Sequence, residues 1–262
     1  MLKTRILTAA IALPVVFGMI ELAPDRVFSV FIFVLGLIGL YEVGAMTHAT
    51  KFRGLAILFF LGFIPMFAFS VGGDPGLWVP AVVFVLMLIL IVRVATSVDS
   101  PIVAEPGALT AIGAPYVGVL YPYFAMLRNR IDGADSTLLV LLLCVVSDSG
   151  AYFAGRSLGR TKLAPRVSPN KTIEGAVGGF LATVVAGLLL RLALEPSWSV
   201  IGTACLAAGV SILAQVGDLA GSALKRSAGV KDSGWIFPGH GGLIDRTCSL
   251  VFAVAFTYYW VK

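Results

Sequence analysis

Long apolar runs constrain this chain more than any other feature. Stretches of about 17 to 25 mostly apolar residues, the length that crosses a bilayer, follow one another with short polar segments between them. Only 13% of the residues are charged, whereas a soluble domain carries roughly 25%. Too little charge is present to cover a globule in water. We therefore expect an all-α, polytopic integral membrane protein.

The apolar runs predict about nine transmembrane helices, since one span needs roughly 20 residues. Their expected ranges are 6–22, 27–46, 55–72, 78–95, 107–127, 137–156, 173–195, 199–218 and 243–261. The first run resembles a signal peptide, but Glu21 stands where a cleavage site needs a small residue. We interpret it as a retained helix. Residues 1–130 are expected to form a scaffold, and residues 131–262 to carry the functional site.

Basic residues predict the orientation. Most of the 19 lysines and arginines fall in segments that face one side, and this side is cytoplasmic under the positive-inside rule. The N-terminus is then cytoplasmic in a cell or inner membrane. The net charge of +5 fits loops that face anionic lipid headgroups, so we expect membrane lipids and no nucleic acid as partners. The three cysteines are isolated and are expected to pack as small apolar residues.

Four acidic residues are expected at the cytoplasmic ends of different spans, namely Asp148, Glu174, Asp218 and Asp245. Asp148 precedes Arg156 by eight residues, which places it about 12 Å inside the helix end. A charge in a span costs roughly 2.5 to 3.5 kcal/mol on insertion scales and usually marks a functional site. The alternative is that each acid pairs with an arginine or stabilises a helix N-terminus.

The polar segment 155–175 is glycine-rich and basic. Ser168, Lys171 and Thr172 precede a predicted helix start, where amide groups and basic side chains suit a phosphate or an anionic headgroup. The alternative is an ordinary basic loop in which Ser168 or Thr172 caps the helix. Gly175 and Gly179, like Gly217 and Gly221, fit close helix packing better than ligand binding.

The segment 215–246 carries the richest pattern. Asp218 and Asp245 bracket it, as a Mg²⁺ site that bridges phosphates would require. Lys225, Arg226 and Lys231 between them could neutralise a polyphosphate. The turn 238–242 lets backbone amides approach an anion. His240 could act as a general base, as a phosphate donor or simply as a turn residue. The glycine patterns of P-loop and dinucleotide-binding proteins are absent from the sequence.

These segments resemble the phosphatidate cytidylyltransferase (CDP-diacylglycerol synthase) family, whose signature has the form S-x-x-K-R-x₄-K-D-x₅-P-G-H-G-G-x-x-D-R. The matching residues are Ser222, Lys225, Arg226, Lys231, Asp232, Pro238 to Gly242, Asp245 and Arg246. Asp148, the pair Gly155-Arg156, the run from Ser168 to Gly175 and the run from Gln215 to Asp218 also resemble that family, as Tyr41-Glu42 does more weakly. The specific motifs lie between about 140 and 250.

The resemblance implies transfer of CMP from CTP to phosphatidic acid, which gives CDP-diacylglycerol and pyrophosphate. It implies a Mg²⁺ ion on Asp218 and Asp245, with a second cation left open, and CTP phosphates on Lys225, Arg226 and Lys231. His240 is a further catalytic candidate. The residues expected near the substrates are Asp148, Arg156, Ser168, Lys171, Thr172, Glu174, Ser222, Asp232 and Arg246.

Two positions depart from the family pattern. Asn170 stands where a basic residue is usual, and Cys248 stands where an Asp usually follows the Asp-Arg pair. Because a thiol is a poor ligand for Mg²⁺, a catalytically impaired variant is one alternative. A membrane transporter is another, although the two halves show no repeat. A CDP-alcohol phosphotransferase would need a D-G-x-x-A-R motif, which is absent. A homodimer stays open.

Overall fold

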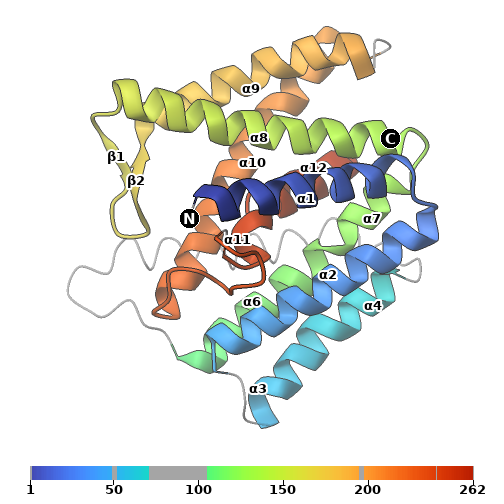
Figure 1. Cartoon of the computed structure of the whole chain (residues 1–262), viewed down its shortest axis with the longest axis vertical. Coiled ribbons are helices and arrows are strands. Elements are labelled where there is room, and N and C mark those ends of the chain that lie inside the picture. The colour runs from blue at the N-terminus through green and yellow to red at the C-terminus, as the bar shows by residue number, and fades with distance from the viewer. Residues whose placement is uncertain (1, 49–51, 71–104, 195–197, 240, 262) are drawn as a thin grey trace.

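The computed structural model describes residues 2–48, 52–70, 105–194, 198–239 and 241–261, and these are mostly helical (Figure 1). The elements are α1 (Leu2–Glu21), α2 (Asp25–Met46), α3 (Phe52–Ile57), the π-helix η1 (Leu58–Phe63), α4 (Ile64–Ser70), α6 (Pro106–Leu120), α7 (Pro122–Arg128), α8 (Gly133–Leu158), β1 (Lys162–Ala164), β2 (Ser168–Thr172), α9 (Ile173–Leu194), α10 (Val200–Ser227), α11 (Ile244–Thr247) and α12 (Leu250–Trp260).

Within the described residues, five helices are long and apolar enough to cross a membrane. They are Asp25–Met46, Pro106–Arg128, Gly133–Leu158, Ile173–Leu192 and Val200–Ser227, and three shorter apolar helices accompany them. The prediction of a helical membrane protein is confirmed. Helices overlap every predicted span except 78–95, which lies outside the described residues, so the count of nine and the side of the N-terminus stay predictions.

Small residues let α8 and α9 run side by side (Figure 1). A Cβ atom on Gly150 would lie 2.9 Å from Cβ of Ala182, and one on Gly179 would lie 2.6 Å from the carbonyl oxygen of Ser147. A Cβ on Gly221 of α10 would likewise lie 2.7 Å from Cβ of Cys248. Such contacts are typical of membrane helices, where close van der Waals packing drives association. Cβ atoms on Gly175 and Gly217 would also meet backbone oxygens, so the packing role predicted for Gly175, Gly179, Gly217 and Gly221 is confirmed.

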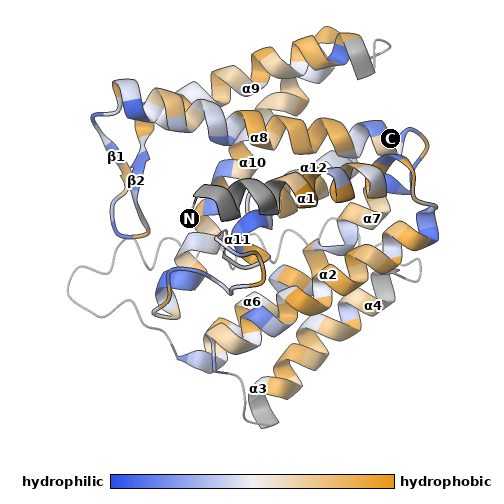
Figure 2. Ribbon diagram, in the orientation of Figure 1, coloured by the Kyte–Doolittle hydropathy of each residue, from blue (hydrophilic) through white to orange (hydrophobic). Residues whose placement is uncertain are grey.

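Most helical residues are apolar (Figure 2), and they include both buried and exposed side chains. Tyr116, Tyr121 and Tyr123 are fully buried. The rings of Tyr116 and Tyr123 contact α12, and the Tyr121 hydroxyl lies 2.5 Å from that of Thr247 on α11. By contrast, Val177, Leu181, Val185 and Leu189 of α9 are exposed at a spacing of four residues and form one stripe along the helix. An apolar stripe that faces outward fits a protein whose solvent is lipid.

A short β-hairpin replaces the loop expected before α9. Strands β1 and β2 pair antiparallel, with Lys162 opposite Thr172 and Ala164 opposite Ser168. The all-α prediction therefore needs one correction. The hairpin is stabilised locally, because the Glu174 carboxylate accepts hydrogen bonds from the backbone amides of Arg160 and Thr161 at 3.1 Å each.

Candidate active site

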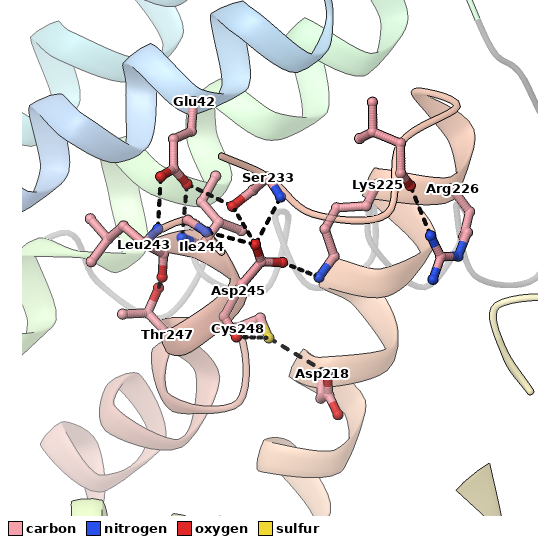
Figure 3. Close-up of polar contacts among 12 residues, drawn as sticks. Glu42, Asp218, Lys225, Arg226, Ser233, Leu243, Ile244, Asp245, Thr247 and Cys248 are labelled. Carbon is pink, nitrogen blue, oxygen red and sulfur yellow. Dashed lines mark hydrogen bonds and ion pairs between the residues drawn. The ribbon is translucent and has the colours of Figure 1, made fainter. Parts of the chain in front are cut away.

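Asp245 lies on α11 and is surrounded by donors (Figure 3). Its Oδ2 accepts hydrogen bonds from the amides of Ser233 at 2.8 Å and Gly242 at 2.9 Å, and from the Ser233 hydroxyl at 3.1 Å. Its Oδ1 pairs with the Lys225 ammonium of α10. The ammonium and the two amides can compensate the burial of an Asp245 carboxylate. The side chain is held in one orientation, because both of its oxygens have donors.

Asp218 lies on α10, and its side chain is more exposed to solvent than that of Asp245. The Lys171 ammonium, at the end of β2, lies 2.6 Å from its Oδ2. The Cys248 thiol donates to its Oδ1 at 3.6 Å. The hairpin thus places one lysine at Asp218, while α10 itself places Lys225 at Asp245. Ser222 lies between them on the same face of α10, since positions four and three residues apart are neighbours on a helix.

Asp148 joins this cluster from α8. The Ser249 hydroxyl lies 3.5 Å from its Oδ2, and its charge interacts with those of Asp218, Lys171 and Arg246. Of the four acids expected at one depth, three therefore gather around the junction of α8, α10 and α11. The fourth, Glu174, anchors the hairpin instead.

Several predicted substrate residues contact other parts of the protein. Arg156 donates to the Tyr152 hydroxyl at 2.9 Å, and Arg226 donates to the carbonyl of Val230 at 2.9 Å. The Thr172 hydroxyl accepts from the amide of Gly175 at 3.1 Å, so it caps α9 as the alternative reading proposed. Lys231, Asp232 and Arg246 are exposed, Ser168 is half-buried, and His240 lies outside the described residues. Their roles toward the substrates stay predictions.

Sequence reasoning did not place Glu42 among the site residues. Glu42 lies on α2, is 1% exposed and reaches the turn that leads into α11 (Figure 3). It accepts hydrogen bonds from the amides of Leu243 at 2.7 Å and Ile244 at 3.0 Å, and from the Ser233 hydroxyl at 2.7 Å. A signal existed, because a carboxylate inside the predicted span 27–46 is costly without a purpose.

The carboxylates of the cluster are chemically suited to bind a divalent cation. In the part of the chain that the structure describes, no three His, Cys, Asp or Glu residues are grouped to hold a metal. Mg²⁺ rarely needs such a cage, because it is usually bound by one or two carboxylates together with substrate phosphates and water. Asp218 and Asp245 provide hard oxygen atoms. Each of these carboxylates already binds a positive charge, the ammonium group of Lys171 or of Lys225.

A mostly apolar groove lies on the same two helices that carry Glu174 and Asp218. It lies between α9 and α10 and has a volume of about 340 Å³. Ile173, Val177 and Phe180 line it from α9, and Ile212, Val216 and Leu219 line it from α10. Leu219 follows Asp218 directly in the sequence, and Ile173 follows Lys171 by two residues. The groove residues Ile173 and Leu219 are thus close in sequence to Lys171 and Asp218, although neither Lys171 nor Asp218 lines the groove.

Fold and site together define a helical membrane protein with a polar, charged cluster built from helices and a hairpin of its C-terminal half, and from one helix of its N-terminal half. The sequence matches the Cytidylyltransferase family over residues 3–262. The chain belongs to this family.

Similar proteins carry a more specific name. The phosphatidate cytidylyltransferase of Bacillus subtilis (strain 168) is 33% identical over 98% of this chain and 97% of its own length. That of Staphylococcus epidermidis (strain ATCC 12228 / FDA PCI 1200) is 33% identical over 97% of this chain and 96% of its own. That of Brucella suis biovar 1 (strain 1330) is 46% identical over 56% of each chain.

Proposed function

We propose that this protein transfers CMP from CTP to phosphatidic acid and gives CDP-diacylglycerol and pyrophosphate for phospholipid synthesis. One observation carries the proposal: relatives named phosphatidate cytidylyltransferase align with nearly the full length of the chain. Membership of the Cytidylyltransferase family makes the chain a nucleotidyltransferase. A transporter and a CDP-alcohol phosphotransferase are not favoured.

The reaction joins two anionic substrates. An oxygen of the lipid phosphate attacks the α-phosphorus of CTP, a new P–O bond forms, and the bond to the pyrophosphate leaving group breaks. No covalent enzyme intermediate is needed, so the protein acts by positioning and by neutralising charge. Lys171 and Lys225 are suited to this task, because each already holds its ammonium group at a carboxylate in the cluster.

We propose that Asp218 and Asp245 would hold Mg²⁺, whose positive charge would stabilise the phosphates of CTP and the leaving pyrophosphate. Within Asp245, Oδ1 would face the ion once Lys225 turns away from it, since Oδ2 accepts hydrogen bonds from the amides of Ser233 and Gly242. Asp218 offers its two oxygens to one ammonium and one weak thiol donor. Lys225 and Lys171 would then turn from the carboxylates toward the phosphates.

The lipid tails need an apolar path to the same place. The groove between α9 and α10 supports such a path, because it lies between two helices long enough to span the membrane and its lining residue Leu219 directly follows Asp218 in the sequence. We propose that the site opens toward the cytoplasm, where CTP is available, in the plasma or inner membrane. We also propose that the protein could form a homodimer, in which exposed apolar stripes such as that of α9 pack against each other.

A turnover assay tests this function. Purified protein in mixed micelles receives CTP labelled in its cytidine, phosphatidic acid and Mg²⁺. We expect label to enter the lipid fraction only when all three are present, with one pyrophosphate released for each labelled lipid. Omission of phosphatidic acid, replacement by diacylglycerol, and a preparation denatured by heat are the controls. Labelled lipid formed without phosphatidic acid, or no labelled lipid at all, would contradict the proposal.

A further inference from the structure

Glu42 places a carboxyl group in the interior of the protein. Its side chain lies near the end of α2 and is almost fully buried. None of the ion pairs found among the described residues includes it. A buried carboxylate is costly unless hydrogen bonds replace its water, and bonds to a charged acceptor are about twice as strong as neutral ones. Glu42 meets this condition through its three donors, and all three belong to the segment 233–245.

Glu42 and Asp245 hold the same turn from two sides (Figure 3). Three consecutive amides divide between them, since Gly242 donates to Asp245 while Leu243 and Ile244 donate to Glu42. Ser233 lies between the two acids, with its hydroxyl oxygen 2.7 Å from one carboxylate and 3.1 Å from the other. A hydroxyl has one hydrogen to donate, so the two carboxylates compete for the Ser233 hydroxyl, and a change at one alters the bond to the other.

Glycine at positions 234 and 242 leaves space for the Glu42 carboxylate, which a side chain at either position would meet. A Cβ atom on Gly234 would lie 2.8 Å from Oε1 of Glu42, and one on Gly242 would lie 2.5 Å from both carboxylate oxygens. Both distances are shorter than real Cβ contacts. The turn is therefore shaped around the Glu42 carboxylate, and a change at Glu42 reaches Asp245 through a short chain of hydrogen bonds.

We propose that Glu42 is a positioning residue of the transfer reaction, which acts through Ser233 and the amides of residues 243 and 244 to fix the orientation of Asp245 and of its partner Lys225. This role rests on the proposed function. It also assigns one part of the site to the N-terminal half of the chain, because Glu42 comes from α2, far from the motifs at 140–250. Groups that orient a metal-binding side chain typically contribute 10- to 100-fold to metal affinity or activity.

Glu42→Gln tests the role with little change of shape. The amide has one acceptor oxygen, and its NH₂ group would oppose at least one of the three donors. In the metal-free purified protein, we expect faster hydrogen exchange in the peptide 236–247, measured by mass spectrometry. In the assay, we expect kcat to fall by about 10- to 100-fold and the Mg²⁺ concentration for half-maximal activity to rise, with a smaller change in the KM for CTP.

Asp25→Asn is the matched control. Asp25 also lies on α2, but it pairs with Arg128 at 2.9 Å, away from the turn. This variant should leave the exchange of 236–247 and the Mg²⁺ requirement as in the parent. Ser233→Ala provides a second route if Glu42→Gln does not insert, because it removes the coupling hydroxyl alone. Combined with Glu42→Gln, it should lower kcat by less than the product of the two single effects, since the residues act as one chain.

The outcomes separate this inference from the proposed function. An inactive parent protein would contradict the function, while exchange at 236–247 would still show whether Glu42 holds the turn. Unchanged exchange and an unchanged Mg²⁺ requirement in Glu42→Gln, with an active parent, would overturn the positioning role. A uniform loss of activity without a shift in the Mg²⁺ requirement would likewise overturn it, because it would indicate a structural role only.

Discussion

The cluster brings acidic and basic side chains close together. Asp218, Asp245 and Asp148 bring three negative charges together, and Lys171, Lys225 and Arg246 bring three positive ones. Charges are costly in a protein interior unless they are paired and hydrogen-bonded. Here every aspartate has a donor at hydrogen-bond distance. Under the proposed function, an anionic substrate would compete with the aspartates for Lys171 and Lys225.

Asp218→Asn and Asp245→Asn should each lower turnover by about 10² to 10³, the usual effect of removing one electrostatic contact from a transition state. In Asp245→Asn, the new NH₂ group would also oppose either Lys225 or the amides of Ser233 and Gly242. Rates at saturating Mg²⁺, with the amount of inserted protein measured in parallel, check this. Activity close to that of the parent in either variant removes that residue from the proposed metal site.

Cys248 is the sharpest departure from the family pattern. It is buried, and its thiol contacts Asp218. Around the position of a Cβ on Gly221, its sulfur lies at 3.5 Å and the Tyr116 hydroxyl at 3.9 Å. That hydroxyl is buried and has no hydrogen-bond partner among the described residues. A carboxylate at position 248 could therefore receive a hydrogen bond that the thiol leaves unused.

Cys248→Asp should accordingly raise activity or lower the Mg²⁺ concentration required, because a second carboxylate beside Asp218 adds a hard oxygen ligand or orients the first. Cys248→Ser is the control, as it keeps the size and adds no charge. A Mg²⁺ titration of both variants and the parent decides the question. If Asp gives no gain over Ser, Cys248 is a packing residue around which the site has adapted.

At the scale of elements, the hairpin β1–β2 delivers Lys171 to Asp218. Its position depends on the start of α9, because Thr172 caps that helix and Glu174 holds the amides at the beginning of the hairpin. The hairpin, the cap and the ion pair therefore form one local unit. An ordinary loop of the same charge would not fix the ammonium of Lys171 at one point.

Thr172→Val removes the cap and keeps the shape of the side chain. We expect a loss of stability of about 1 kcal/mol and weaker binding of substrate, as Lys171 loses its fixed position. Thr172→Ser keeps the hydroxyl and should retain the stability of the parent. Thermal unfolding in detergent and the KM for CTP are the measurements. Equal midpoints for the Val and Ser variants would contradict the capping role.

At the scale of the whole molecule, α8 offers a test of orientation. Its 26 residues span about 39 Å at 1.5 Å per residue, enough to cross a hydrocarbon core of about 30 Å. Asp132 precedes this helix and Lys162 follows it, and both side chains are exposed. The two residues should therefore face opposite sides of the membrane.

With the native cysteines replaced, a cysteine at position 162 should react with an impermeant thiol reagent only from the cytoplasm, and one at position 132 only from outside. The prediction follows from the excess of lysine and arginine in the segments assigned to the cytoplasm. Intact cells and inside-out vesicles give the two readings. The reverse pattern would place the active site on the outer side and would contradict the proposed access to CTP.

The sequence alone determined the class of the protein and much of the site. Low charge and long apolar runs leave few folds other than a membrane bundle, because backbone groups in lipid must be satisfied within helices or closed barrels. The predicted ranges agree with α2 and α8 to within several residues, since apolar length is a local property. The end predicted at 218 is wrong for α10, which continues to Ser227 and carries Ser222, Lys225 and Arg226 on the helix. Asp148, Asp218 and Asp245 were also found from their cost within spans.

Only the tertiary structure decided which partners these residues have. The contact from Ser233 to Glu42 joins positions 191 residues apart, and local periodicity contains no information about it. The hairpin was missed because its pairing depends on Glu174 and Thr172, whose charge and hydroxyl fitted a substrate site equally well in the sequence. A polar side chain in an apolar protein is visible in the sequence, because its burial is costly wherever it lies. Its partner is not, because packing brings together donors and acceptors that the chain keeps far apart.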